Sequence, residues 1–193
     1  EVVVGYCNHQ MLQLGCAAAS AIASGTWMNV RCFPPEKFRA KLDDEIKRKA
    51  TWYYSPTLLS EYKMASLDLA DRHGVSDLIR PPIDCDSPHA DVLFEGVQPS
   101  SVGWSETLAF RHYLSCLKQQ CESVVAATFD DTIGNYRKRL DVAEAGLQQL
   151  HGLAITGQKR DFLACIDACR GALSLFEKDR GVVLRRKWAD LTS

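Results

Sequence analysis

The chain has 193 residues, of which 46% are apolar and 24% are charged, and its formal net charge at pH 7 is -1. This composition is typical of a globular protein and excludes a disordered or fibrous chain. The length favours one domain over residues 1–193, large enough to fold without metals or cross-links. Because the net charge is near zero, nucleic acid or an anionic membrane could be bound only through a local patch.

The N-terminal segment is apolar and rich in small residues, and residues 2–30 contain no Asp, Glu, Lys or Arg. Polar residues such as Asn8 interrupt it, so its apolar run is shorter than the ~20 residues that a membrane span needs. We therefore expect no span, and a buried helix over residues 11–24. The sequence begins with Glu1 rather than Met. This is consistent with two alternatives, that a leader peptide has been removed or that the sequence starts inside a longer polypeptide.

Two amphipathic helices are predicted next, so that residues 1–80 form a set of N-terminal helices. The first begins after Pro34 and Pro35 and has a narrow apolar stripe at four-residue spacing. The second has Ser55 as its N-cap, Pro56 at its first position and Gly74 as its stop. The apolar positions of the two helices are Phe38, Leu42 and Ile46, then Leu58, Tyr62, Ala65 and Leu69.

Residues 81–103 hold four of the seven prolines and show no helical period. They are interpreted as one long central loop, with a short strand over residues 92–97. Loops of more than about 15 residues are uncommon inside compact domains and often carry function. This loop is the predicted boundary between the two halves of the chain.

Residues 104–193 contain three segments in which apolar residues alternate at spacings of three and four. Such heptad patterns place an apolar seam on one side of each helix, and the short connections favour antiparallel neighbours. The predicted fold is therefore all-α: a helical domain with a C-terminal three-helix heptad-patterned bundle, a basic tail and the central loop. The seams are Phe110, Leu114, Leu117, Cys121 and Val124; Ile133, Tyr136, Leu140, Ala143, Leu147, Leu150 and Ala154; and Phe162, Cys165, Cys169, Ala172 and Phe176.

The eight cysteines are interpreted mainly as small core residues. Cys121, Cys165 and Cys169 fall on the seams, and a chain of this size needs no disulfide framework. This favours the cytoplasm, and secretion stays open. If a bridge forms, Cys116 to Cys169 is the expected pair.

The cysteines lack the spacing of a zinc knuckle, although a pair on one helix could still contribute ligands. The loop DCDSPHAD suits a divalent cation better than any other segment. Its ligands for a divalent cation would be Asp84, Asp86, His89 and Asp91. A polar turn in which the aspartates accept hydrogen bonds from nearby amides is the favoured alternative. We accordingly expect no cofactor.

The sequence contains no nucleophile elbow, HExxH, Walker A loop or GxGxxG motif. A catalytic cysteine and histidine could still meet in the fold, and the two pairs close in sequence are Cys7 with His9 and His112 with Cys116. His112 lies off the predicted seam of its helix, so we expect it on the solvated surface.

Two basic clusters adjoin aromatic residues and could bind phosphates and stack bases. Cationic residues are also favoured at helix C-termini, which is the interpretation preferred here. The clusters are Lys47, Arg48 and Lys49 with Trp52, and Arg185, Arg186 and Lys187 with Trp188.

The leading functional hypothesis is a non-enzymatic protein–protein interaction module: an adaptor, an effector or an assembly subunit. Sustained heptads and missing catalytic motifs favour association with another protein or with a second copy, through helix faces or the 81–103 loop. The alternatives are an enzyme whose site is a Cys/His pair or the carboxylates of the 84–91 loop, and a nucleic-acid binder that uses both basic clusters.

Overall fold

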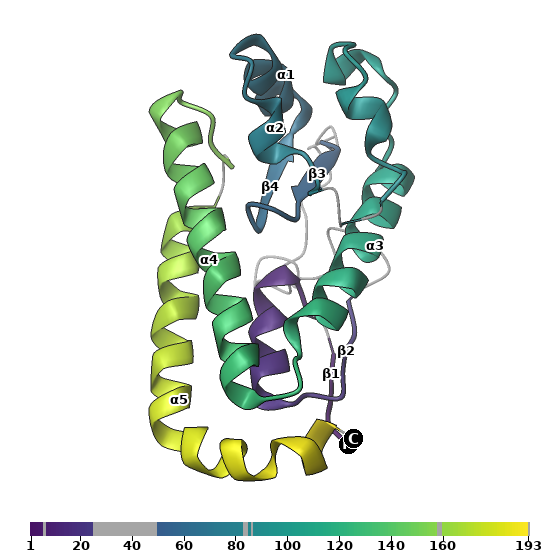
Figure 1. Cartoon of the computed structure of the whole chain (residues 1–193). Coiled ribbons are helices and arrows are strands. Elements are labelled where there is room, and N and C mark those ends of the chain that lie inside the picture. The colour runs from purple at the N-terminus through teal and green to yellow at the C-terminus, as the bar shows by residue number, and fades with distance from the viewer. Residues whose placement is uncertain (6, 25–49, 83–84, 86, 158–159, 193) are drawn as a thin grey trace, which may run out of the picture.

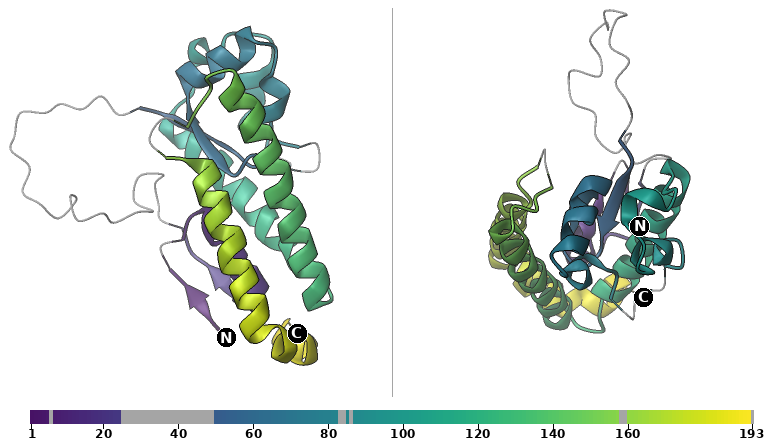
Figure 2. Two further views of the ribbon diagram at one scale, coloured as in Figure 1. Left: turned by 90° about the vertical axis from the view of Figure 1, so that its left-hand side faces the viewer. Right: turned by 90° about the horizontal axis from the view of Figure 1, so that it is seen from above.

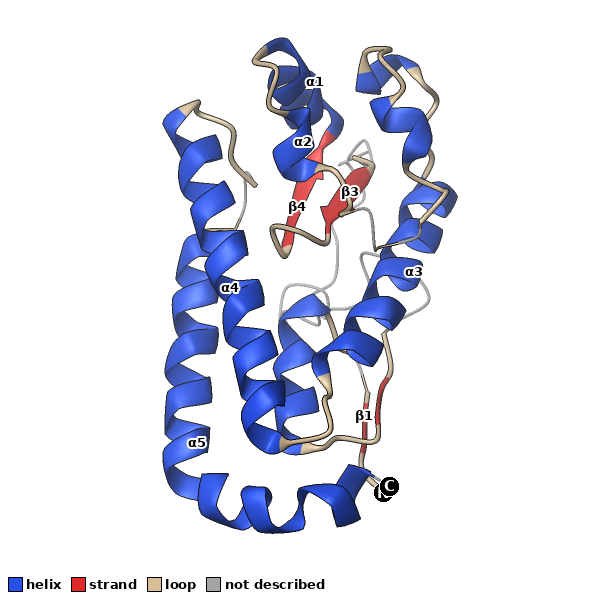
Figure 3. Ribbon diagram, in the orientation of Figure 1, coloured by secondary structure: helices blue, strands red, loops and turns tan. Residues whose placement is uncertain are grey.

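The computed structural model describes residues 1–5, 7–24, 50–82, 85, 87–157 and 160–192. The described chain is mostly helical, as predicted, and it also contains two small two-stranded sheets (Figures 1 and 3). The predicted helix after Pro34 lies outside the described residues. The elements are β1 (Val3–Val4), η1 (His9–Ala17), β2 (Ala21–Ile22), β3 (Trp52–Ser55), β4 (Ser60–Lys63), α1 (Met64–Arg72), α2 (Ser76–Ile79), η4 (Asp91–Phe94), η5 (Pro99–Ser101), α3 (Glu106–Val124), α4 (Phe129–Gly152) and α5 (Phe162–Thr192).

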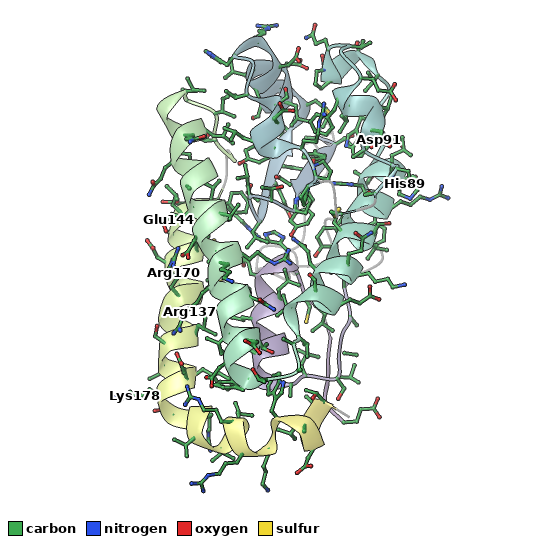
Figure 4. The ribbon with its side chains drawn as sticks, in the orientation of Figure 1. His89, Asp91, Arg137, Glu144, Arg170 and Lys178 are labelled. Carbon is green, nitrogen blue, oxygen red and sulfur yellow. The ribbon has the colours of Figure 1, made fainter. Side chains whose placement is uncertain are left out.

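The helices α4 and α5 run antiparallel and pack along their length (Figure 1). Thr128 caps α4 by accepting a hydrogen bond from the Asp131 amide. Arg170 of α5 reaches across to Asp141 (2.6 Å) and Glu144 (2.7 Å), and Figure 4 shows Glu144 and Arg170 next to one another on the two helices. Arg170 and Glu144 are half-buried and Asp141 is exposed, so these partly exposed ion pairs should contribute little to the free energy of unfolding.

The last turns of α5 bend and run beneath the other helices, so both chain ends lie at the same end of the molecule (Figures 1 and 2). Gly181 is buried on the inner side, where an added Cβ would lie 3.6 Å from the Phe129 ring. Trp188 packs edge-on against the same ring and donates from Nε1 to the Ala126 carbonyl (2.9 Å). The bent segment is therefore held by core packing.

The predicted helix that starts at Ser55 is wrong over its first half, where the chain forms the antiparallel β3–β4 hairpin. The spacings of four, three and four residues between its apolar positions suggested a helix, but the strand pairing places Tyr53 opposite Tyr62. Leu59, at φ 48°, closes the turn in the left-handed region. The second half is helical as α1, and Gly74 follows its end at φ 67°, where a glycine is favoured.

The predicted N-terminal helix is shorter than expected and is a 3₁₀ helix. Asn8 accepts from the Gln10 amide at its start, and Ala18 ends it at φ 55°. The chain then turns back, and β2 pairs with β1 in parallel. The element η1 packs against α3, α4 and α5, so the segment that was predicted to be buried lies among the other helices.

The central loop holds two 3₁₀ turns, η4 and η5, so the predicted strand over residues 92–97 is wrong. Its main anchor is Asp68 of α1, which accepts from the Ser100 amide (2.9 Å) and from Gln98 Nε2 (2.9 Å). Among the loop residues that the structure describes, four side chains are buried, namely Ser87, Ala90, Leu93 and Pro99. The loop is therefore packed onto the helices.

The seam of α4 is confirmed: every predicted position within the helix is buried. The buried face of α3 is rotated by about one residue, so that Leu114 is 40% exposed while His112, Tyr113 and Cys116 are buried. On α5, Ala172 is exposed and Leu173 is buried. The reason is packing: α3 lies mainly against η1 and β3, which the heptad pattern could not reveal.

Candidate functional site

His112 lies in the middle of α3 and is fully buried, so the prediction that this residue is solvated is wrong. Its Nε2 lies 2.8 Å from the Tyr54 carbonyl oxygen, which can only accept, so Nε2 carries the proton. Nδ1 is then an acceptor, and the Ser87 hydroxyl donates to it at 2.7 Å. His112 thus joins α3, β3 and the central loop.

His112 is held in its neutral form. Burial lowers the pKa of its imidazole to about 4, with a smaller contribution in the same direction from His89. The hydrogen bond with the Tyr54 backbone and the charge of Asp91 act in the opposite direction but do not offset burial. The ring also stacks on Tyr53, with the centroids 4.9 Å apart.

Two cysteines adjoin this histidine. Cys116 lies one helical turn after His112, and its sulfur is 3.6 Å from Nδ1. The sulfur of Cys85, from the central loop, lies 3.5 Å from that of Cys116. Cys116 is fully buried and Cys85 is half-buried. The pKa of the Cys116 thiol is well above its usual value; the hydrogen bond with Cys85 is the largest cause and burial is the second.

This thiol–histidine cluster, comprising Cys85, Ser87, His112 and Cys116, does not fit nucleophilic catalysis. A catalytic cysteine needs a lowered pKa and access to its substrate. Here the pKa of Cys116 is raised, and both Cys116 and His112 have no exposed surface. The four-residue spacing of His112 and Cys116 was visible in the sequence, whereas the approach of Cys85 and Ser87 depends on the fold.

The acidic loop is only partly described, because Asp84 and Asp86 lie outside the described residues. Asp91 is exposed and His89 is half-buried, and Figure 4 shows the two near one another beside α3. The described residues contain no group of three or more His, Cys, Asp or Glu side chains that could hold a metal ion.

The two basic clusters receive little support. Lys47, Arg48 and Lys49 lie outside the described residues, and Trp52 is half-buried with the Lys63 ammonium 5.4 Å from its ring. Arg186 and Lys187 are exposed. Arg185 is paired with Asp130 (2.8 Å) and with Glu177 (3.3 Å). The ring of Trp188 is in the core and is not available to stack on bases.

A groove of about 230 Å³ lies beside η1, where β2 and the end of α3 meet. It is smaller than the ~300–1,000 Å³ usual for a small-molecule site. Its lining is mostly apolar and includes Met11, Leu12, Ile22, Cys121 and Val125. The groove presents few polar groups that could fix the orientation of a ligand.

Several large apolar side chains are exposed on α4 and α5. Leu175 is 61% exposed, Val182 62% and Val183 53% on α5, and Val142 is 56% exposed on α4. Leu175 and Val182 are seven residues apart and so share one side of α5. This surface is the candidate site that the geometry favours, because apolar side chains on one face are typical of protein contacts.

No protein-family model, no curated protein and no solved structure matches this chain. Within the described residues, no helix combines the length and the apolar content that crossing a membrane would require.

Proposed function

We propose that the protein is a non-enzymatic α-helical module that binds another protein through the outer side of α5, and that the partner there is a second copy of the chain. The observation that carries the proposal is a second heptad stripe, opposite the buried one. We call it the outer stripe. Its residues are all exposed and are spaced four, three, four, three and four apart: Ala164, Ala168, Gly171, Leu175, Lys178 and Val182.

One side of α5 is buried in the core and the opposite side is exposed. Phe162, Ile166 and Leu173 are buried on the inner side, where α5 packs on α4 and η1. At 3.6 residues per turn the outer stripe lies about half a turn away from them. Apolar residues at heptad spacing are the pattern by which one helix binds another. Exposing apolar side chains to water is unfavourable in free energy, and association of two helices would bury them.

The order of residues along the outer stripe favours an antiparallel second copy. A two-fold axis level with Leu173, in the straight part of α5, would place Gly171 of each copy opposite Leu175 of the other, and Ala168 opposite Lys178. Each large side chain would then face a small one, which allows the helices to approach closely. An interface of this kind is isologous, since the same patch is used by both subunits.

The contact should be weak. A single pair of helices buries less surface than the ~1,600 Å² of a standard protein interface. Lys178 also lies in the outer stripe and must extend its charged end to solvent. We therefore expect a dissociation constant on the order of micromolar.

The experiment is the native mass of the full chain by light scattering at increasing concentration, with and without reductant. The wild type should shift from monomer to dimer in both conditions. L175E should stay monomeric, because it places a charge in the centre of the contact. L114E is the matched control, since Leu114 is an exposed leucine on α3, and it should dimerise like the wild type. A monomeric wild type, or dimerisation of L175E, would contradict the proposal.

A further inference from the structure

We propose that Cys85 and Cys116 are a disulfide-forming pair, a site of reversible oxidation that fastens the central loop to α3. Their sulfurs are 3.5 Å apart, which is longer than the ~2.05 Å of a disulfide bond but within sulfur–sulfur contact. In the part of the chain that the structure describes, they are the two cysteines whose sulfurs touch.

The surroundings of the two cysteines keep their sulfurs in contact. Cys116 is fixed within α3, where His112 adjoins its sulfur, and Cys85 lies on a loop segment between α2 and η4. The neighbouring Ser87 is hydrogen-bonded to His112, which keeps this part of the loop against the helix. The fold therefore holds the two thiols together without help from a bond.

The two thiols differ in access, and this assigns their roles. Cys85 is half-buried and can meet a small oxidant, whereas Cys116 has no exposed surface. Cys85 is accordingly the thiol that reacts first, and Cys116 is the one that resolves the intermediate. The hydrogen bond with Cys85 and, after it, burial also raise the pKa of Cys116, so the reaction should be slow at neutral pH and faster at alkaline pH.

The oxidant is a low-molecular-weight disulfide such as glutathione disulfide. The Cys85 thiolate attacks one of its sulfurs, the sulfur–sulfur bond of the oxidant breaks, and the first glutathione leaves with the proton that Cys85 lost. Cys116 then attacks the Cys85 sulfur of the mixed disulfide, and the second glutathione leaves with the Cys116 proton. Two electrons have passed from the cysteine pair to the oxidant, which is reduced to two glutathione molecules.

The new bond would close a loop of 31 residues that includes η4 and η5. It would restrict the unfolded chain and hold the loop on α3. The outer stripe of α5 is not involved, so this inference does not depend on the proposed dimer.

The test is oxidation of the folded full chain in a mixture of reduced and oxidised glutathione, followed by peptide mapping without reductant. The expected result is one dominant cross-linked peptide that joins Cys85 to Cys116 and has lost two hydrogens. In urea, the same treatment should distribute the bonds over several cysteine pairs. C121S, which alters a half-buried cysteine of the same helix, should give the wild-type product.

C116S supplies the second readout. With the resolving thiol removed, Cys85 should stop at the mixed disulfide with glutathione, and this adduct should form more than tenfold faster than any adduct on Cys116 in C85S. Two results would overturn the proposal: Cys85 and Cys116 remaining thiols while other cysteines are oxidised in the folded chain, or the same distribution of bonds with and without urea.

Discussion

Replacing Gly146 by alanine should destabilise the protein, although alanine is the better helix former. Gly146 lies in α4 against Leu58, in the turn of the β3–β4 hairpin, and an added Cβ would lie 2.3 Å from Leu58 Cδ2. Leu58 is buried, and it belongs to the close-packed core. The leucine could avoid the new methyl group only by displacing other core side chains.

The magnitude follows from two opposed effects. Alanine in place of glycine gains about 1 kcal/mol of helix propensity. Forcing an extra methyl group into a packed core costs about 1–3 kcal/mol, and a contact far inside the usual ~3.5–4.0 Å separation favours the upper value. We therefore expect G146A to lower the free energy of unfolding by about 2 kcal/mol.

The matched control is G134A on the same helix, where an added Cβ meets no atom within 4 Å. This variant should be stabilised by up to about 1 kcal/mol. Urea unfolding followed by circular dichroism measures both, and a double-mutant cycle with L58A isolates the contact. Equal effects of the two alanine substitutions, or no coupling between Gly146 and Leu58, would refute the packing of the hairpin on α4.

Three further predictions concern polar groups. The pKa of His112 is about 4 in the folded chain, against an ordinary 6.5, so neutral His112 contributes about 3 kcal/mol to the free energy of unfolding above pH 6.5, and this is lost as the pH falls to 4. Urea unfolding at several pH values should show this loss in the wild type. An H112N variant that loses stability in the same way would contradict it. Y54F removes the donor to Gln120 Oε1 (2.8 Å) and should cost about 1–3 kcal/mol, so a neutral result in urea unfolding would count against that bond. R170A removes two surface ion pairs and should cost no more than about 1 kcal/mol, and a larger loss in thermal unfolding would show that they matter more than exposure allows.

The C-terminal helices were the most predictable part of the fold. The buried stripe of α4 extends from Ile133 to Leu150 without interruption, and a stripe of that length fits no other secondary structure. The β3–β4 hairpin was not predictable in the same way. Tyr54, Leu58 and Tyr62 follow helical spacing, and only the buried tertiary environment of the tyrosines, such as the hydrogen bond from Tyr54 to Gln120, favours strands over a helix.

The candidate sites also differ in how far the sequence alone could predict them. The stripe of Leu175 and Val182 is a property of one helix, so it could be found from sequence once the buried side of α5 is known. The contact of Cys85 with Cys116 joins a loop to a helix and depends on the packing of Ser87 against His112. The rotation of α3 by about one residue, which buries His112, results from η1 and β3, whose positions no local pattern reveals.

A photo-cross-link tests whether α5 binds a second copy of the chain in antiparallel orientation. A benzophenone amino acid in place of Lys178, in the straight part of α5, would be irradiated in the full chain at a concentration where it forms dimers. We expect intermolecular cross-links to residues around Ala168 of the second copy, with the yield abolished by L175E. Cross-links centred on residue 178 of the second copy, or no intermolecular product, would contradict the antiparallel contact.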